Sequence, residues 1–333
     1  MNFRSVAGQK EVITGLENSI KNEKVGHAYM FCGPKGCGKR MVTKIFAGML
    51  LCQNPILHES DKNIDMCGSC SACRLREEGT NPDFYTLAAE ENSISVEDIR
   101  KLQSDIMIRP FYSKRKIYLI EEADKMTVQA QNCLLKTLEE PPRYVVILLT
   151  VSNEDALLET IHSRVTKIHF KKNTAEEVRQ VVESRLKKVV ENMDFIISYS
   201  DGIIGTALEL ADSEEFSRIR QRVIEIIERL TKSKLLDVFE VYDFFEDNKN
   251  NMDIIFDIMI LFYRDLLVAT RHWDENILIN SDKKDIIFSS ISKFSTGKLV
   301  RNIEVIEMTR KNLKYNANFQ LAIEMMLMKL QEE

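Results

Sequence analysis

Residues 28–51 read AYMFCGPKGCGKRMVTKIFAGMLL, and this stretch decides the fold class. Ala28 to Cys32 has the length and apolar composition of a buried strand. The loop that follows directly fits the pattern GxxxxGK, and a helical pattern begins at Arg40. In this setting glycines let backbone N–H groups converge on phosphate groups, and the lysine adds a positive charge. The candidate phosphate-contacting residues are Gly33, Gly36, Gly38 and Lys39.

The position after the lysine departs from the pattern of an active nucleotide site. An active loop carries Ser or Thr there, whose hydroxyl ligates Mg²⁺, whereas this chain has Arg40. A guanidinium group has no acceptor and brings a permanent positive charge toward the metal. We therefore favour a loop that keeps its shape without hydrolysing nucleotide, and the same reasoning speaks against binding of ATP and Mg²⁺.

Two further strand-like runs, Lys116–Ile120 and Tyr144–Thr150, alternate with helical patterns, which predicts a parallel sheet covered by helices. Glu121 and Glu122 follow the first of these runs, where an active site of this kind has a metal-linked Asp and a catalytic Glu. Glu121 is one methylene longer than Asp and can still bind a metal. The alternative is that both are ordinary acids that open a helix.

The second half of the chain reads as helical. All six prolines lie at or before Pro142, and few glycines follow. Thr174 and Glu177 form a candidate capping box, and Ser213 is a candidate cap for a helix that reaches Leu230. We expect an α/β domain over 1–170, a small helical domain over 171–210 and a larger helical domain over 211–333.

Composition excludes several classes of protein. With 44% hydrophobic and 29% charged residues, the 333-residue chain can bury a core, which rules out general disorder. A net charge of -5 argues against a surface that coats itself in nucleic acid. The most apolar stretch, Ile254–Phe262, is interrupted by Asp257 and is too short to cross a bilayer, and the N-terminus lacks a signal-peptide pattern. We expect a cytoplasmic protein that is not bound to membranes.

A cysteine cluster follows the phosphate-loop helix. Three thiols stand at CxxCxxC spacing and a fourth lies fifteen residues upstream, so that four thiolates can close a tetrahedral structural zinc site. The candidate ligands are Cys52, Cys67, Cys70 and Cys73, with His58 and Asp65 as substitutes for Cys52. An iron–sulfur cluster and unligated cysteines are the alternatives. We favour zinc because nothing else in the chain suggests redox chemistry.

Taken together and in this order, the motifs resemble those of bacterial clamp-loader subunits of the AAA+ class. Besides the phosphate loop and the cysteines, the resemblance rests on Asn81–Asp83, Ile94–Ile99, Tyr118–Thr127, Leu134–Pro142, Ser163–Val165 and Asn316–Glu324. It covers essentially the whole chain. It implies an AAA+ sheet domain with a zinc-binding insertion at about residues 52–73, a small helical lid domain and a C-terminal helical collar that joins a ring-like assembly.

The resemblance also implies roles for single residues. Ser163-Arg164-Val165 is similar to the family's Ser-Arg-Cys motif, whose arginine reaches the γ-phosphate of ATP held by a neighbouring subunit. Without the resemblance, Arg164 would read as a surface ion pair. Ser152 aligns with the family's sensor-one residue, and Gly205 stands about where active relatives carry a sensor-two arginine.

The length and the altered phosphate loop are more similar to a non-motor subunit of this family than to its gamma/tau motors. The implied partners are the gamma/tau ATPase subunits and the delta subunit, with the sliding clamp and primer-template DNA reached through the complex. Two rival readings stay open. One is an active ATPase that uses Lys39 and Glu122, and the other is a zinc-stabilised DNA-binding module that acts alone.

Overall fold

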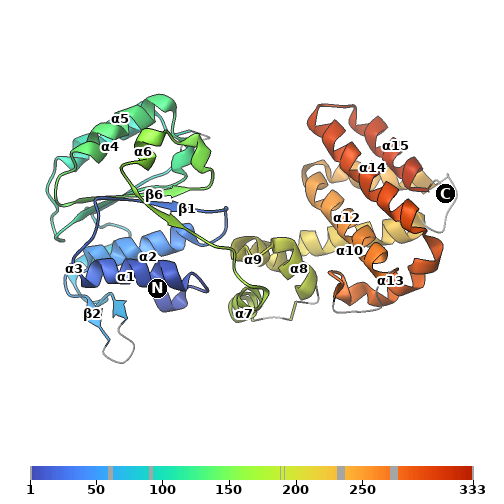
Figure 1. Ribbon diagram of the computed structural model, residues 1–333, viewed down its shortest axis with the longest axis horizontal. Helices are drawn as coiled ribbons and strands as arrows, with labels where there is room; N and C mark the ends of the chain where they lie inside the picture. The colour runs from blue at the N-terminus through green and yellow to red at the C-terminus, as the bar shows by residue number, and fades with distance from the viewer. Residues whose placement is uncertain are drawn as a thin grey trace. The chain divides into compact units, whose positions relative to one another are not determined.

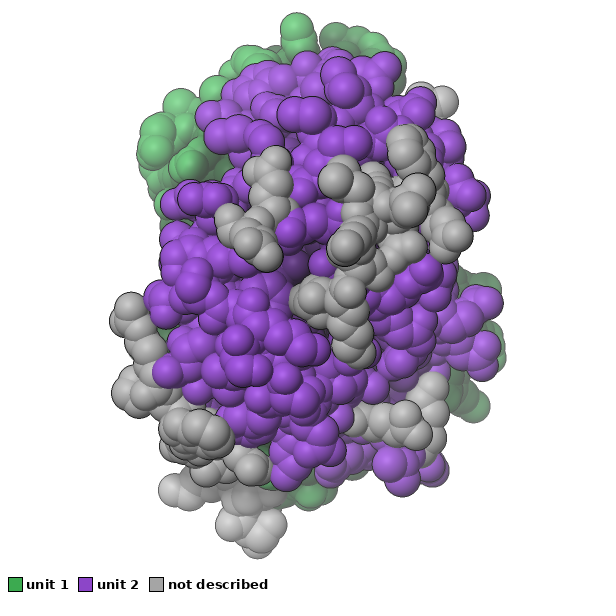
Figure 2. Space-filling model, turned by 90° about the vertical axis from the view of Figure 1, so that its right-hand side faces the viewer, with its two compact units in different colours: residues 1–181, 201–206 green, residues 182–200, 207–333 purple. Residues whose placement is uncertain are grey.

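The computed structural model describes residues 2–58, 63–89, 93–187, 189–190, 192–230, 237–270 and 277–331. The chain divides into two compact units, coloured in Figure 2. Unit 1 comprises residues 1–181 and 201–206, and unit 2 comprises residues 182–200 and 207–333. Each unit is described by itself.

Within the described residues, unit 1 is built on a five-stranded sheet in which all strands are parallel. In spatial order the strands are β4 (Phe84–Leu87), β5 (Lys116–Ile120), β6 (Val145–Val151), β1 (Ala28–Cys32) and β7 (Thr166–His169). The expected bounds of β1 and β5 are confirmed, and β6 begins and ends one residue later than expected. The two edge strands have few buried residues, which is why periodicity did not reveal them.

Helices cover both faces of this sheet (Figure 1). On one face lie α1 (Lys10–Lys21) and α2 (Lys39–Leu51). On the other lie α4 (Val96–Ile106), α5 (Val128–Glu139) and α6 (Glu159–His162). Successive residues of a strand point to opposite faces, so Tyr29 and Phe31 join the first core while Met30 and Cys32 join the second. The predicted α/β fold class is thereby confirmed.

An insertion follows α2. It contains a two-stranded antiparallel hairpin, β2 (Ile56–Leu57) and β3 (Ile64–Asp65), and the helix α3 (Ser71–Glu77). The insertion packs on α2 at Gly48, where an added Cβ would lie 2.5 Å from Met66 Sδ and 2.7 Å from Arg76 Nε. A side chain at this position would therefore require Met66 and Arg76 to shift.

The predicted capping box is present where α7 (Ala175–Leu186) begins: Glu177 N–H donates to Thr174 Oγ1, and Thr174 N–H donates to the Glu177 carboxylate. Two short helices follow, α8 (Met193–Ser200) and α9 (Ile204–Asp212). Short 3₁₀ turns occur at η1 (Phe3–Ser5), η2 (Ala123–Lys125), η3 (Glu154–Ala156), η4 (Lys249–Asn251), η6 (Ser281–Lys283) and η7 (Ile291–Lys293).

Within its described residues, unit 2 consists of helices and the turns that join them. Its longer elements are α10 (Glu214–Leu230), α11 (Asp237–Asp247), α12 (Met252–Ala269), α13 (Lys284–Ser290), α14 (Thr296–Lys314) and α15 (Phe319–Gln331). The predicted cap of α10 is confirmed, because Phe216 N–H donates to Ser213 Oγ. Asn316 adopts a left-handed conformation with φ 59°, which ends α14 and lets α15 turn back. Among the described residues, no helix has both the length and the apolar character that crossing a membrane requires.

Candidate functional site: a phosphate loop and a four-cysteine cluster

The phosphate loop keeps the backbone shape that its pattern predicts. Gly33, Gly36 and Gly38 all have positive φ, at 152°, 85° and 93°. These conformations are costly for residues with a Cβ, so the three glycines are required for the turn between β1 and α2. The loop therefore has the tight glycine turn that its sequence pattern requires.

The lysine of the loop is engaged by its own loop. The Lys39 ammonium donates to the carbonyls of Gly33 at 2.6 Å and Pro34 at 2.9 Å, and lies 3.2 Å from Ser152 Oγ. Burial lowers the pKa of Lys39 below its ordinary value. The contact with Ser152 places the sensor-one candidate beside the loop.

Glu121, the first of the two candidate acids, is already paired with two cationic side chains. Glu121 Oε1 lies 2.6 Å from Arg40 Nε and 3.2 Å from Lys44 Nζ. Its side chain is only 10% exposed, whereas that of Arg40 is 67% exposed. Arg40 stands where the sequence pattern expects a magnesium-binding hydroxyl, and Glu121 stands where it expects a magnesium-binding Asp. In this structure the two side chains form an ion pair.

The second acid is oriented by the loop that follows β5. Glu122 has a left-handed backbone with φ 52°, and its N–H donates to Thr150 Oγ1. A hydrogen bond from Lys125 lowers the pKa of its carboxyl, so Glu122 is ionised at neutral pH. Sequence reasoning missed Asp124, whose carboxylate accepts from the N–H groups of Ser152 and Asn153. Asp124 thereby links the residues that follow β6 to the turn η2, which follows Glu121 and Glu122.

The segment 201–206 closes on the phosphate loop within unit 1. Gly205 N–H donates to the carbonyl of Gly36 at 2.9 Å. A Cβ on Gly205 would lie 2.7 Å from Gly36 Cα and 2.9 Å from Gly36 O, closer than real Cβ contacts allow. Gly205 is therefore packed backbone to backbone against the loop.

Arg164 lies on a different side of the sheet domain, between α6 and β7. Its guanidinium donates to the Thr160 carbonyl at 2.8 Å, to Ser163 Oγ at 3.1 Å and to Glu139 Oε1 at 2.7 Å. Both partners of the ion pair are partly exposed. They line a surface pocket of about 670 Å³ together with Gly26, His27, Ala28, Leu138, Val165 and Thr166. The arginine is thus held at the surface by contacts that solvent reaches.

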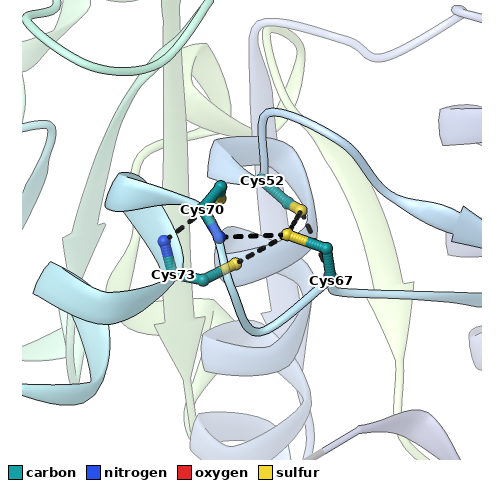
Figure 3. Close-up of side chains that lie close together, drawn as sticks. All are labelled: Cys52, Cys67, Cys70 and Cys73. Atoms are coloured by element: carbon teal, nitrogen blue, oxygen red, sulfur yellow. Dashed lines mark hydrogen bonds between the residues drawn. The ribbon is translucent and has the colours of Figure 1, made fainter.

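The four predicted cysteines converge (Figure 3). Their sulfur atoms all lie within 4.8 Å of one another, with 3.5 Å between Cys52 and Cys67 and 4.0 Å between Cys67 and Cys73. A tetrahedral zinc with Zn–S bonds of about 2.3 Å requires S···S separations of about 3.8 Å. The cluster has the number, type and spacing of ligands that such an ion takes.

Backbone groups prepare the cysteine cluster for negative charge. The N–H groups of Cys67, Cys70 and Cys73 donate to the sulfurs of Cys52, Cys67 and Cys70 respectively. The hydrogen bond from Cys70 lowers the pKa of Cys67 to about 6, whereas burial raises the pKa values of Cys52 and Cys73, so an ion would have to displace protons from those two thiols. The substitute ligands pair with each other instead, since His58 Nε2 lies 3.1 Å from Asp65 Oδ2.

Comparison with known proteins places this architecture. A family model for the delta subunit of DNA polymerase III matches residues 8–174, and a model for the C-terminal part of that subunit matches residues 214–332. Subunit delta′ of DNA polymerase III from Bacillus subtilis (strain 168) is 31% identical over 97% of this chain and 96% of the relative. The chain belongs to the DNA polymerase III clamp-loader family, in its delta-prime-like branch. The resemblance to clamp-loader subunits that the sequence indicated is thereby confirmed.

Tau and gamma-related subunits of DNA polymerase III are also similar to this chain. The tau subunit of Bacillus subtilis (strain 168) is 27% identical over 98% of this chain, which spans 61% of that relative. A crystal structure of a gamma subunit-related protein from Thermotoga maritima aligns with 95% of this chain and 98% of its own, at 19% identity and a TM-score of 0.47.

Proposed function

We propose that this clamp-loader subunit does not hydrolyse ATP itself and offers Arg164 to ATP held by a neighbouring subunit. The Arg40–Glu121 pair carries the first half of the proposal. Magnesium binding at this site would need the Glu121 carboxylate, which already faces two cations, Arg40 and Lys44. A third, divalent charge at that point would be repelled by both.

Two more features of the loop support the absence of turnover. Lys39 satisfies the carbonyls of its own loop rather than projecting toward an incoming phosphate. The peptide of Gly205 occupies space directly on Gly36, so a nucleotide phosphate at this part of the loop would have to displace the segment 201–206. Both contacts would be lost on nucleotide binding, which weakens binding as well as catalysis.

Arg164 suits a role in trans because the groups that hold it are replaceable. An exposed ion pair such as Arg164–Glu139 contributes about 0.2–1 kcal/mol, so its exchange for a phosphate costs little. A guanidinium can follow charge that spreads over phosphoryl oxygens, and fingers of this kind contribute roughly 10³- to 10⁵-fold in rate. Glu139 would then orient Arg164 until the phosphate of a neighbouring subunit's nucleotide takes the place of the Glu139 carboxylate.

The proposed partners follow from the family. ATPase subunits of the gamma/tau type and a delta subunit would assemble with this chain through its C-terminal helices. The sliding clamp and primer-template DNA would be engaged through the complex in the cytoplasm. We also assign structural zinc to the four-cysteine cluster, because four sulfur ligands leave no open position for water.

The test is reconstitution of the complete clamp loader with Arg164→Ala. We expect assembly to be retained while ATP hydrolysis at the neighbouring site falls by at least 10³-fold, in line with other arginine fingers, so that the ATPase rate of the complex loses the share contributed by that site. Arg143→Ala is the matched control, since Arg143 is an exposed arginine of the same unit. An unchanged ATPase rate in the Arg164→Ala complex would remove the proposed role.

Glu139→Gln separates a finger from a structural ion pair. If Glu139 only restrains Arg164, its loss should leave the ATPase rate of the complex equal to or up to about 5-fold above that of the wild type, matching an exposed pair of up to about 1 kcal/mol. If the pair instead holds the fold together, both variants should lower thermal stability equally.

The proposal that this chain does not hydrolyse ATP is tested on the isolated chain. We expect no magnesium-dependent ATP hydrolysis above background, with Lys39→Ala identical to the wild type. Turnover that Lys39→Ala abolishes would establish the motor reading. Tight, salt-dependent DNA binding by the isolated chain would instead favour a DNA-binding module that acts alone.

A further inference from the structure

Among the described residues, a second group of metal-ligand side chains lies apart from the four cysteines. Cys32 Sγ, a carboxylate oxygen of Glu154 and a ring nitrogen of His169 all lie within 4.8 Å of one another. Neither the phosphate loop nor Arg164 uses these side chains. They come from three elements: the end of β1, the turn η3 and the end of β7.

The sheet itself brings two of the three together. Cys32 and His169 are register partners in the parallel β1–β7 pair, so their side chains leave the same face of neighbouring strands. Glu154 is placed by η3, which follows β6 on the other side of β1. Backbone pairing therefore fixes Cys32 beside His169, and the side chain of Glu154 reaches them from the turn.

The distances fit a small divalent ion. His169 Nδ1 lies 3.2 Å from Glu154 Oε1. Two ligands of one tetrahedral zinc, with Zn–N and Zn–O bonds of about 2.0–2.2 Å, stand about 3.4 Å apart. The sulfur, at no more than 4.8 Å from either atom, needs only a small side-chain adjustment to complete a three-ligand site.

The donor set also fits in charge and softness. A thiolate and a carboxylate together neutralise a divalent cation, and imidazole with thiolate selects zinc over magnesium or calcium. Three protein ligands leave a fourth position for water or an incoming ligand, unlike the closed four-cysteine cluster.

Neighbouring groups oppose the binding of an ion by Cys32, Glu154 and His169 in two ways. Burial raises the pKa of Cys32 to about 12, so an ion must displace the thiol proton. Lys167 Nζ lies 3.9 Å from Glu154 Oε2 and competes for that carboxylate. The His169 side chain is 61% exposed, which leaves a route from solvent.

We propose that Cys32, Glu154 and His169 form a second, three-ligand zinc site with one open coordination position. The ion would tie the strand that enters the phosphate loop to the segment that carries Ser152 and Arg164. Because these residues are separate from the magnesium position at Glu121, the proposal holds whether or not the chain hydrolyses nucleotide.

The experiment counts zinc bound to the purified full chain after equilibration with buffered zinc. We expect two equivalents in the wild type and one in His169→Ala, whose exposed side chain can be removed without disturbing the core. Cys32→Ser should behave like His169→Ala. Cys133→Ser, a change of a half-buried cysteine elsewhere in unit 1, is the matched control and should retain two.

Cobalt substitution distinguishes the two sites. In a Cys70→Ser/Cys73→Ser double variant, one cobalt equivalent should remain and show a single-thiolate charge-transfer band, which His169→Ala should abolish in that background. Two outcomes overturn the proposal. One is a Cys70→Ser/Cys73→Ser variant that binds no metal, and the other is a second equivalent that His169→Ala leaves in place.

Discussion

Replacement of Gly205 by alanine tests whether the segment 201–206 is closed on the phosphate loop. The new Cβ would lie 2.7 Å from Gly36 Cα, 2.9 Å from Gly36 O and 3.2 Å from Gly36 C. All three atoms belong to backbone, which cannot rotate away as a side-chain tip can. Either Gly205 or the loop must move, and the hydrogen bond between them must lengthen or break.

The cost follows from these contacts. Overpacking against backbone costs about 1–3 kcal/mol. Loss of the Gly205–Gly36 hydrogen bond adds about 1 kcal/mol. Alanine regains at most about 1 kcal/mol of helix propensity in α9. We expect the closed arrangement to lose about 1–3 kcal/mol relative to local opening, the balance of these contributions.

Amide hydrogen exchange is the appropriate assay because it reports local opening. A loss of 1–3 kcal/mol should accelerate exchange in residues 33–39 and 201–206 by about 5- to 150-fold. Gly15→Ala is the matched control. Gly15 is exposed in the middle of α1, where a Cβ would meet no described atom within 4 Å, and alanine should stabilise by about 0.5–1 kcal/mol.

Wild-type exchange rates in both segments of a folded Gly205→Ala protein would refute the closure. The steric part of the case against nucleotide binding would then fall, and only the pairing of Arg40 with Glu121 would remain.

Two further predictions concern the insertion and the magnesium position. Gly48→Ala places a Cβ against the side chains of Met66 and Arg76, and Arg76 can move away only by giving up its hydrogen bond to the Lys44 carbonyl, so release of cluster zinc to a chelator should accelerate and stability should fall by about 1 kcal/mol; zinc release as slow as in Gly15→Ala would show that the insertion does not depend on this contact. Arg40→Thr combined with Glu121→Asp restores the residue types of an active site but leaves Gly205 on Gly36, so calorimetry should detect no ATP binding; binding that depends on magnesium would show that charge alone, and not closure, disables the site.

Local elements were predictable because their signals lie within a few residues. The strand Ala28–Cys32, the glycine turn and α2 form one contiguous pattern, and the cap residues Thr174 and Ser213 act on N–H groups three positions away. The edge strands β4 and β7 escaped prediction because short, partly exposed strands carry little apolar periodicity. The break between α14 and α15 depends on one left-handed residue, Asn316, which a periodic pattern does not mark.

The roles of the site residues and the three-domain division stay predictions. Sequence spacing was enough to indicate the four-cysteine cluster. Three of the cysteines share one short motif, and the structure places the fourth candidate, Cys52 at the end of α2, beside them. No spacing rule indicated the cluster of Cys32, Glu154 and His169, because its members are spread over more than a hundred positions.

By itself, the sequence determined the local chemistry of this protein: a phosphate-type turn, an arginine in place of a magnesium ligand, and a cysteine motif. Only the tertiary structure decided which of these groups meet. Arg40 forms an ion pair with Glu121, Gly36 packs against the backbone of Gly205, and Arg164 forms an ion pair with Glu139. The physical reason is that backbone conformation depends on near neighbours in the chain, whereas these pairings depend on the order of strands and on which ends and faces that order brings together.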